Sequence, residues 1–406
     1  MLVQRVVTPI NQALPDIKPR TPVGSLQRCR YQGLRSHYPA RMVLPAVGMN
    51  AAFVERVVGR RDSFAVDDVL ALLDQDAFQE TFVPRSGVME WLEASVTARP
   101  DRVVQPNPDG ADLRLGHALD LLEAVPDETV QCVVTSTPYW GMRVYEDTFT
   151  ARWADGEVCP YGHEQTPEGF VRHTVEVLLA LSRVVTPDGS LWWNIMDSFN
   201  TRTQIRRNAV EALRAMQGLD GRAWADHAAR RHSAGHAYLK DGEQCLIPAM
   251  IAERASRIGL YVKTVVTWAK RASLPEPQNS RVSRALEYVL HLTKQRAPKF
   301  SRNAYHKVSA EFGGRDNGWE PEKLSDVWVL NTSAGGGHGA QFPTALPGRC
   351  IALTTTPGDL VLDPFVGSGN TGLAALHHGC RFLGFDVSQT YLAMAKEKLS
   401  RSLITL

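Results

Sequence analysis

Short apolar runs alternate along residues 110–400 with longer stretches in which apolar residues recur every three or four positions. Runs of this length are typical of buried strands, and the longer stretches have the spacing of amphipathic helices. Strands are expected within 129–136, 190–199, 260–270, 287–294, 359–365 and 381–387, and helices within 117–126, 166–185, 245–259 and 369–379. Apolar strands that alternate with helices predict an α/β fold, with a mostly parallel sheet covered by helices on both faces.

Residues 1–108 have a different pattern. The first 62 residues are rich in Pro and Arg and have weak periodicity, whereas 63–82 and 87–100 have helical spacing. A turn cluster at 106–110 is the expected boundary with the rest of the chain. We therefore predict an N-terminal extension with a small helical module at 1–108 and an α/β domain at 109–406.

One strand of the predicted sheet runs directly into the glycine-rich stretch DPFVGSGNTG, residues 363–372. Glycines let the backbone approach a ligand, and Asp386, which ends the next strand, is suited to a ribose diol. This pattern fits a dinucleotide as well as any other ligand that contains adenosine. The acidic Asp363 beside the turn favours a cationic ligand such as S-adenosylmethionine, because a pyrophosphate needs a helix N-terminus without nearby anions.

A second strand ends in Ser136, Thr137, Pro138 and Tyr139. These residues offer a hydroxyl, a backbone carbonyl and an aromatic face at one point. Accepting both N–H protons of an exocyclic amino group turns its lone pair toward an incoming methyl group, and a stacked ring holds the base flat. The stretch therefore predicts methylation of an amino group.

The two strand ends together resemble the amino-methylating DNA methyltransferases, which modify N4 of cytosine or N6 of adenine. STPY is similar to their catalytic Ser/Asp/Asn-Pro-Pro-Tyr/Phe motif, and DPFVGSGNTG is similar to their cofactor motif. The catalytic motif comes first, as in the circularly permuted beta group. The resemblance implies a circularly permuted methyltransferase fold with a seven-stranded, mostly parallel sheet whose last strand is antiparallel. It also implies methyl transfer from S-adenosylmethionine to a flipped base of double-stranded DNA.

The resemblance also implies roles for single residues. Ser136 and the Thr137 carbonyl would hold the target amino group within the Ser136–Tyr139 motif, which includes Pro138, and Tyr139 would stack on the base. The expected cofactor-binding residues are Asp363, Pro364, Phe365, Gly367, Ser368, Gly369, Asn370, Thr371, Asp386 and His117.

Two of these positions depart from the family pattern. Thr137 replaces the usual first Pro, which keeps the carbonyl but adds a β-branched side chain. His117 stands where relatives often have Asp, so it is either a cofactor contact or a packed histidine.

Ser136 at the head of the motif favours N4-cytosine, since Asp or Asn is commoner there in adenine enzymes; N6-adenine is the alternative. Two other interpretations remain at this point. A nicotinamide-dependent oxidoreductase would use the glycine turn and Asp386, and a DNA-binding homologue could have lost activity through Thr137. A C5-cytosine mechanism is excluded because its nucleophilic cysteine follows a proline, and the chain has no Pro-Cys dipeptide.

The composition is that of an ordinary globular protein, with 44% hydrophobic residues and a net charge of +2. The distribution of charge is more informative, because residues 1–61 carry ten basic and two acidic side chains. Such segments favour contact with phosphates. We expect DNA contacts from insertions at 201–240 and 297–330, the latter a target-recognition candidate, and from Arg202, Arg206, Arg207, Arg230 and Arg231.

The six cysteines form no Cys-x-x-Cys pair, which argues against a disulfide framework or a four-cysteine zinc site. Cys159 and His163 would supply half of a metal site, but without a second pair an ordinary loop and no metal are expected. No apolar run is long enough to cross a membrane, and no signal peptide is recognised. We therefore expect a cytoplasmic protein. The resemblance to the DNA methyltransferases implies a prokaryotic, nucleoid-associated protein in a restriction-modification or epigenetic role, with a cognate restriction endonuclease as a candidate partner.

Overall fold

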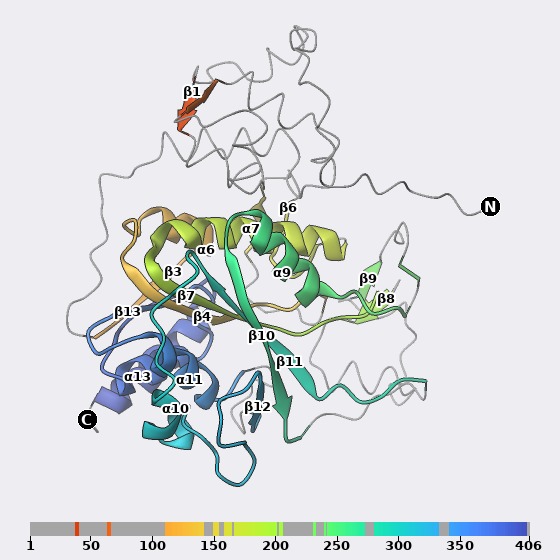
Figure 1. Ribbon diagram of the computed structural model, residues 1–406. Helices are drawn as coiled ribbons and strands as arrows, with labels where there is room; N and C mark the ends of the chain where they lie inside the picture. The colour runs from red at the N-terminus through yellow and green to blue at the C-terminus, as the bar shows by residue number, and fades with distance from the viewer. Residues whose placement is uncertain are drawn as a thin grey trace, which may run out of the picture.

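The computed structural model describes residues 37–39, 63–65, 110–141, 149–153, 158–164, 166–200, 203–205, 230–232, 239–240, 242–272, 280–332 and 341–403. The described residues form an eight-stranded sheet with helices packed on both of its faces (Figure 1). Its strand order is β12-β10-β11-β7-β4-β13-β14-β3. The strands are β3 (Ala111–Leu115), β4 (Val130–Ser136), β7 (Val185–Ile195), β10 (Tyr261–Lys270), β11 (Leu286–Thr293), β12 (Val327–Leu330), β13 (Leu360–Asp363) and β14 (Arg381–Asp386).

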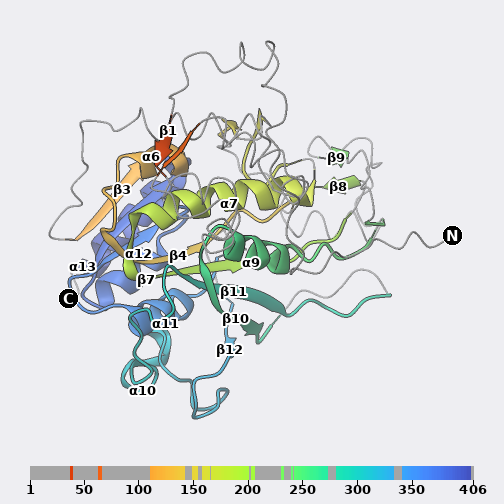
Figure 2. The same ribbon diagram turned by 45° about the horizontal axis from the view of Figure 1, so that its top comes forward.

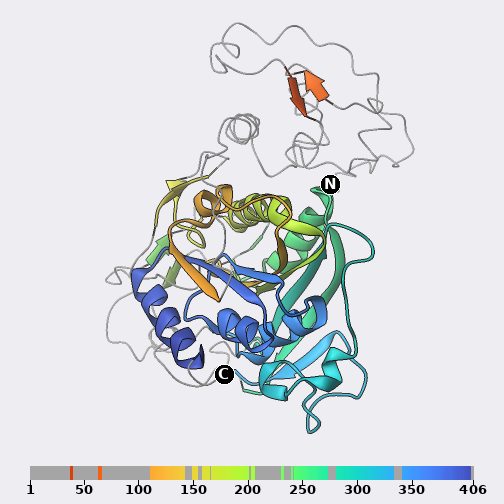
Figure 3. The same ribbon diagram turned by 90° about the vertical axis from the view of Figure 1, so that its left-hand side faces the viewer.

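The helices form a layer on each face of this sheet. One face is covered by α6 (Ala118–Glu123), α7 (Pro167–Val184) and α9 (Ile247–Arg257) (Figure 2). The other face is covered by α11 (Ala345–Thr354), α12 (Asn370–His377) and α13 (Gln389–Leu403) (Figure 3). Neighbouring residues of β4 serve the two layers in turn, since Val133 packs in one core and Cys132 and Val134 pack in the other. The predicted sheet with two covered faces is confirmed.

The expected seven strands are corrected to eight. The additional strand is β12, which pairs in parallel with β10 at the edge of the sheet, with Trp328 opposite Trp268. Within the described sheet only β11 runs antiparallel, and it lies between β7 and β10. The sequence pattern missed both β3 and β12. They have five and four residues, and none in β3 and only Trp328 and Leu330 in β12 are buried, which is too weak a signal for periodicity.

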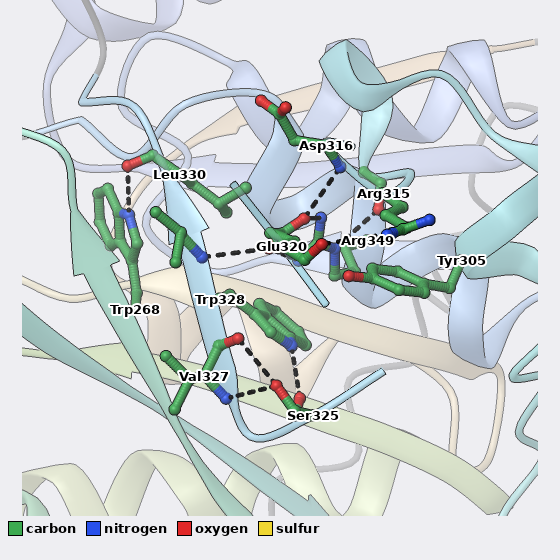
Figure 4. Close-up of polar contacts among 12 residues, drawn as sticks. Trp268, Tyr305, Arg315, Asp316, Glu320, Ser325, Val327, Trp328, Leu330 and Arg349 are labelled. Atoms are coloured by element: carbon green, nitrogen blue, oxygen red, sulfur yellow. Dashed lines mark hydrogen bonds and ion pairs between the residues drawn. The ribbon is translucent and has the colours of Figure 1, made fainter. Parts of the chain in front are cut away.

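The candidate target-recognition segment, 297–330, is held against the sheet domain by a buried ion pair. The segment contains α10 (Ala304–Lys307), the short 3-10 helix η3 (Ala310–Phe312) and β12. Arg349 of α11 forms a two-pronged pair with Glu320, with N–O distances of 2.6 and 2.7 Å (Figure 4). Arg349 also donates to the carbonyls of Gly313 and Gly314, so one side chain fixes two turns of the segment.

Three further pairs of short strands are described. β5 (Ala151–Arg152) pairs with β6 (Val158–Cys159), and β8 (Thr203–Ile205) pairs with β9 (Arg230–His232) inside the 201–240 insertion. In the N-terminal region, β1 (His37–Pro39) pairs with β2 (Ser63–Ala65). The start of the helix expected at 63–82 is therefore a strand, because the backbone groups of Ser63–Ala65 are used in pairing. The rest of the expected helical module lies outside the described residues.

Candidate active site

The predicted site residues meet at one edge of the sheet. Ser136, Asp363 and Asp386 end the neighbouring parallel strands β4, β13 and β14, so their side chains share the carboxyl edge. His117 follows the next parallel strand, β3, whose Leu115 is opposite Asp386. The carboxyl edge of a parallel sheet is where such folds bind ligands.

Asp363 is buried and fully engaged by the protein. One carboxylate oxygen accepts hydrogen bonds from Thr135 at 2.6 Å and from the Phe365 backbone N–H at 3.0 Å, and the other accepts one from Thr371 at 2.6 Å. Burial raises its pKa to about 6, against the lowering effect of the bonds from Thr135 and Thr371. Asp363 therefore ties the strand of the catalytic motif to the glycine turn.

Different structural reasons require glycine at the positions of this turn. Gly367 and Gly369 adopt left-handed φ values of 51° and 88°. A Cβ on Gly369 would lie 3.0 Å from Ala395 of α13, and one on Gly372 would lie 2.7 Å from Phe382 of β14. A Cβ on Gly367 would meet only the Phe365 carbonyl, at 4.0 Å, so the backbone at Gly367 is open to a ligand.

The polar side chains of the same turn are mostly used inside the protein. Lys398 of α13 donates to Ser368 Oγ at 3.0 Å and to Asn370 Oδ1 at 2.7 Å. Asn370 in turn donates to the Phe342 carbonyl at 2.8 Å. Ser368 and Asn370 thus anchor the turn to α13 and to residues 341–344, and the side that remains for a ligand is the backbone around Gly367.

Asp386 is positioned by two backbone donors. Its carboxylate accepts from Gly367 N at 2.9 Å and from Ser388 N at 2.9 Å, and the residue is only partly buried. It therefore stands beside the open Gly367 backbone, which matches the requirements of an adenosine ribose placed at the turn. The residues present fit S-adenosylmethionine at this edge.

His117 is a buried ring in an aromatic cluster. It stacks on Phe149 with ring centroids 5.4 Å apart and meets the edge of Trp153 at 5.5 Å. Burial lowers its pKa, so the ring is neutral near pH 7. The Gly116 N–H donates to the Asp386 carbonyl at 2.9 Å, which places His117 beside the ribose candidate. Packing and a cofactor contact are both compatible with this position.

The catalytic motif belongs to a buried polar network. Tyr139 Oη lies 3.1 Å from Ser136 Oγ and donates a short hydrogen bond to Glu287. Asn194 Nδ2 lies within 3.3 Å of Ser136 Oγ, 2.7 Å of Tyr139 Oη and 2.6 Å of Glu287 Oε2. Lys270 pairs with the other oxygen of Glu287 at 2.6 Å. The network joins the motif to β7, β11 and β10.

Asn194, Glu287 and Lys270 were missed by the sequence reasoning. Asn194 is the polar residue inside the apolar run LWWNI and lies opposite Ser136 in the sheet, which is a signal that the sequence did contain. Glu287 lies near the start of β11, and an antiparallel strand brings its first residues to the edge where its neighbours end. Such a contribution depends on the strand order, which the sequence does not show.

Two buried oxygens next to Ser136 have no hydrogen-bond partner among the described residues, namely Thr137 Oγ1 and Asn194 Oδ1. A buried acceptor without a partner costs about 1–3 kcal/mol, so such atoms are often completed by a ligand. Asn194 Oδ1 lies beside Ser136, where the motif is expected to receive an amino group.

The predicted DNA-binding arginines are placed only in part. Arg230 and Arg231 belong to β9. Arg202, Arg206 and Arg207 lie outside the described residues.

Among the described residues, no helix has both the length and the apolar character that a membrane span requires.

The fold and the two strand ends define an α/β methyltransferase with a permuted order of motifs. A family model described as a DNA methylase matches residues 130–397, and the chain belongs to this family of N6- and N4-type DNA methylases. The family predicted from the two motifs is thereby confirmed, and its cofactor is S-adenosylmethionine. The interpretation as a nicotinamide-dependent oxidoreductase is wrong.

Two bacterial relatives cover most of the chain. The Type II methyltransferase M.XycI of Xanthomonas campestris pv. cyanopsidis is 30% identical over 303 residues, which is 74% of this chain and 92% of the relative. M.Cfr9I of Citrobacter freundii is 31% identical over 292 residues, or 72% and 88% of the two chains. In its fold the chain is similar to the PvuII DNA methyltransferase (cytosine-N4-specific), with a TM-score of 0.50 and 19% identity, over 72% of this chain and 91% of that one.

Proposed function

We propose that this DNA methyltransferase modifies the exocyclic N4 amino group of cytosine in double-stranded DNA. The observation that carries the proposal is the Ser136 hydroxyl, which lies beside a buried oxygen of Asn194 that has no hydrogen-bond partner among the described residues. An amino group brings two N–H donors, which the Ser136 hydroxyl and the Thr137 carbonyl can accept. The cytosine assignment is supported by Ser at the head of the motif and by the N4-cytosine specificity of the PvuII enzyme, which shares the fold.

The cofactor would lie along the open backbone at Gly367, with its ribose hydroxyls on Asp386. When bound, it supplies an electrophilic methyl group on a sulfonium. Asp363 is completely occupied by Thr135, Thr371 and a backbone N–H, so its proposed contribution is to hold the turn rather than to contact the cofactor. The remaining polar side chains of the turn act in the same indirect way.

The target base would be held by the catalytic motif. The Ser136 hydroxyl and the Thr137 carbonyl accept the two amino protons, which directs the nitrogen lone pair away from the ring plane and toward the methyl group. Asn194 Oδ1 is a further acceptor next to Ser136. The Tyr139 ring stacks on the base, and its hydroxyl is fixed by Asn194 and Glu287.

The methylated nitrogen must then lose one proton. Ser136 Oγ accepts this proton as it passes its own to Tyr139 Oη, and Tyr139 passes its proton to Glu287. The Glu287 carboxylate ends protonated, and Lys270 beside its other oxygen keeps it in place. This relay requires no covalent enzyme intermediate.

DNA contacts are proposed for the N-terminal extension at 1–108. They are also proposed for two insertions in the catalytic domain at 109–406, which are residues 201–240 and 297–330. Extruding the base costs a few kcal/mol of stacking and pairing, which phosphate contacts and the aromatic pocket must offset. The Type II relatives suggest a restriction-modification role alongside a cognate restriction endonuclease, acting on DNA in the nucleoid of a prokaryotic cytoplasm.

The test uses the full-length protein, double-stranded DNA and S-adenosylmethionine labelled in its methyl group. After digestion to nucleosides, the label is expected in N4-methylcytosine. Label in N6-methyladenine would overturn the choice of base, and absence of label would favour the impaired homologue. Ser136→Ala serves as the control, since it should abolish turnover while still binding the cofactor in calorimetry.

A further inference from the structure

Three potential metal ligands meet beside the catalytic motif. Cys159 ends β6, Glu164 lies in the turn before α7, and His173 lies in the second turn of that helix. All three are buried, and one ligand atom from each lies within 4.8 Å of the other two. A tetrahedral zinc ion with bonds of about 2.0–2.3 Å separates its ligand atoms by about 3.3–3.6 Å, so the trio needs only small shifts to bind one.

The Glu164 carboxylate is the least satisfied of the three groups. One oxygen accepts from the Gly162 N–H at 3.1 Å and lies 3.0 Å from His173 Nδ1. The other oxygen is buried without a hydrogen-bond partner among the described residues. A divalent ion would accept a lone pair from this oxygen and so satisfy it.

The imidazole of His173 is already oriented for ligation. Trp153 stacks on it with centroids 4.1 Å apart and planes within 4°, and Trp153 is itself fixed by a hydrogen bond to the Cys159 carbonyl. The stacking fixes the plane of the imidazole beside the Glu164 carboxylate.

We propose that Cys159, Glu164 and His173 bind one zinc ion, with water as the fourth ligand. Binding releases the Cys159 thiol proton and the proton shared between Glu164 and His173, so no oxidant or reductant is involved. The proposal replaces the sequence-based expectation of no metal. It also replaces the pair Cys159 and His163, because the second and third ligands are Glu164 and His173.

The segment that carries the ligands is packed between the two motifs of the site. The Gly141 N–H donates to the Gly162 carbonyl at 2.9 Å, and Trp140 Nε1 donates to the Glu164 carbonyl at 3.0 Å. Tyr161 stacks on Phe365 of the cofactor motif with centroids 5.3 Å apart. Zinc would therefore hold residues 158–164 in the position that supports both motifs, as a structural ion.

The first experiment measures metal directly in the full-length protein. Elemental analysis of protein purified without chelator, or saturated with Zn²⁺ and then desalted, is expected to give one zinc per chain. Replacement by Co²⁺ should produce a thiolate-to-cobalt charge-transfer absorption. Protein that retains no zinc after saturation, or that gives no thiolate absorption with Co²⁺, would overturn the proposal without any variant.

Matched variants then assign the ligands. Cys159→Ser and His173→Gln should lower the zinc content to a tenth or less, and Cys159→Ser should remove the cobalt charge-transfer absorption. Cys245→Ser, at another buried cysteine, should keep both signals. Unchanged zinc in a folded Cys159→Ser protein would refute the assignment. These readouts do not involve methylation, so they are independent of the outcome of the activity test.

Discussion

Thr135 at the end of β4 donates a 2.6 Å hydrogen bond to Asp363 at the end of β13, although 228 residues separate them in the chain. The two strands are neighbours in the sheet, so the bond joins the catalytic motif to the cofactor turn. Thr371 holds the other oxygen of Asp363 from the first turn of α12. The distance between the target base and the cofactor is thus set by side chains inside the protein. These side chains do not have to contact either molecule.

Asp363 predicts a specific dependence of stability on pH. Its pKa is raised from 3.8 to about 6 by burial, so the folded protein binds more protons than the unfolded chain between these values. The contribution of Asp363 to the free energy of unfolding should therefore be fully present below about pH 4 and should be lost as the pH rises through about 6. Asp363→Asn, which is neutral at every pH, should remove this component of the fall.

Thermal unfolding midpoints of the wild type and Asp363→Asn, measured from pH 4 to 7, check this prediction. Asp359→Asn is the control at a partly exposed carboxylate that pairs with Lys299. Parallel curves for the wild type and Asp363→Asn would show that the Asp363 carboxyl titrates normally.

Two variants of Tyr139 can separate the contribution of its ring from that of its hydroxyl. Tyr139→Phe removes the bonds to Ser136, Asn194 and Glu287 but keeps the proposed stacking face. We expect about a 10-fold to 150-fold lower turnover, since a hydrogen bond to a charged group contributes about 1.5–3 kcal/mol. Tyr139→Ala should lose a further 1–3 kcal/mol, about 5-fold to 150-fold, with the stacking. Single-turnover methylation measures both, and equal losses would mean that the ring does not stack on the base.

The sequence predicted most of the sheet and the two strand ends, because long apolar runs and motif residues are local signals. It did not predict β12, whose four residues become a strand only by pairing with β10. Glu287 enters the site on the antiparallel strand β11, and Lys270 enters it at the end of β10. These strands lie two and three positions away from β4, and no local pattern encodes that order. Glu164 and His173 likewise come within 4.8 Å of Cys159 only in the folded chain, and no local spacing in the sequence indicates that contact.

Thr137 tests how much of the catalytic motif lies in its backbone. Its hydroxyl is buried without a partner among the described residues, so the nearly isosteric Thr137→Val should keep or raise the unfolding midpoint. Turnover should stay within about twofold if the reaction uses only the carbonyl. Thr137→Pro, which restores the family motif, should also be active; a large gain from a nearly inactive wild type would instead identify an impaired enzyme. Labelled methyl incorporation distinguishes these outcomes.

The arginines of the 201–240 insertion should contribute affinity rather than sequence choice. Neutralising Arg206, Arg207, Arg230 and Arg231 together should weaken binding to all DNA sequences if they contact phosphates. Each lost contact should reduce the slope of log K against log salt by about 0.9. Fluorescence anisotropy with a specific and a scrambled duplex measures this slope, and an unchanged slope would leave these side chains as solvated surface.

The ion pair of Arg349 and Glu320 should matter more for stability than for chemistry (Figure 4). Arg349→Met leaves the fully buried Glu320 without its partner and should cost about 3–5 kcal/mol, because an uncompensated buried charge is strongly unfavourable. The double variant Arg349→Met with Glu320→Leu should recover part of this loss, since neither charge remains. Arg401→Met is the matched control, because Arg401 pairs with Glu397 on an exposed helix surface. Denaturant unfolding measures all three proteins, and a double variant less stable than Arg349→Met alone would show that Glu320 stabilises the segment through its backbone contacts with Asp316 and Val329.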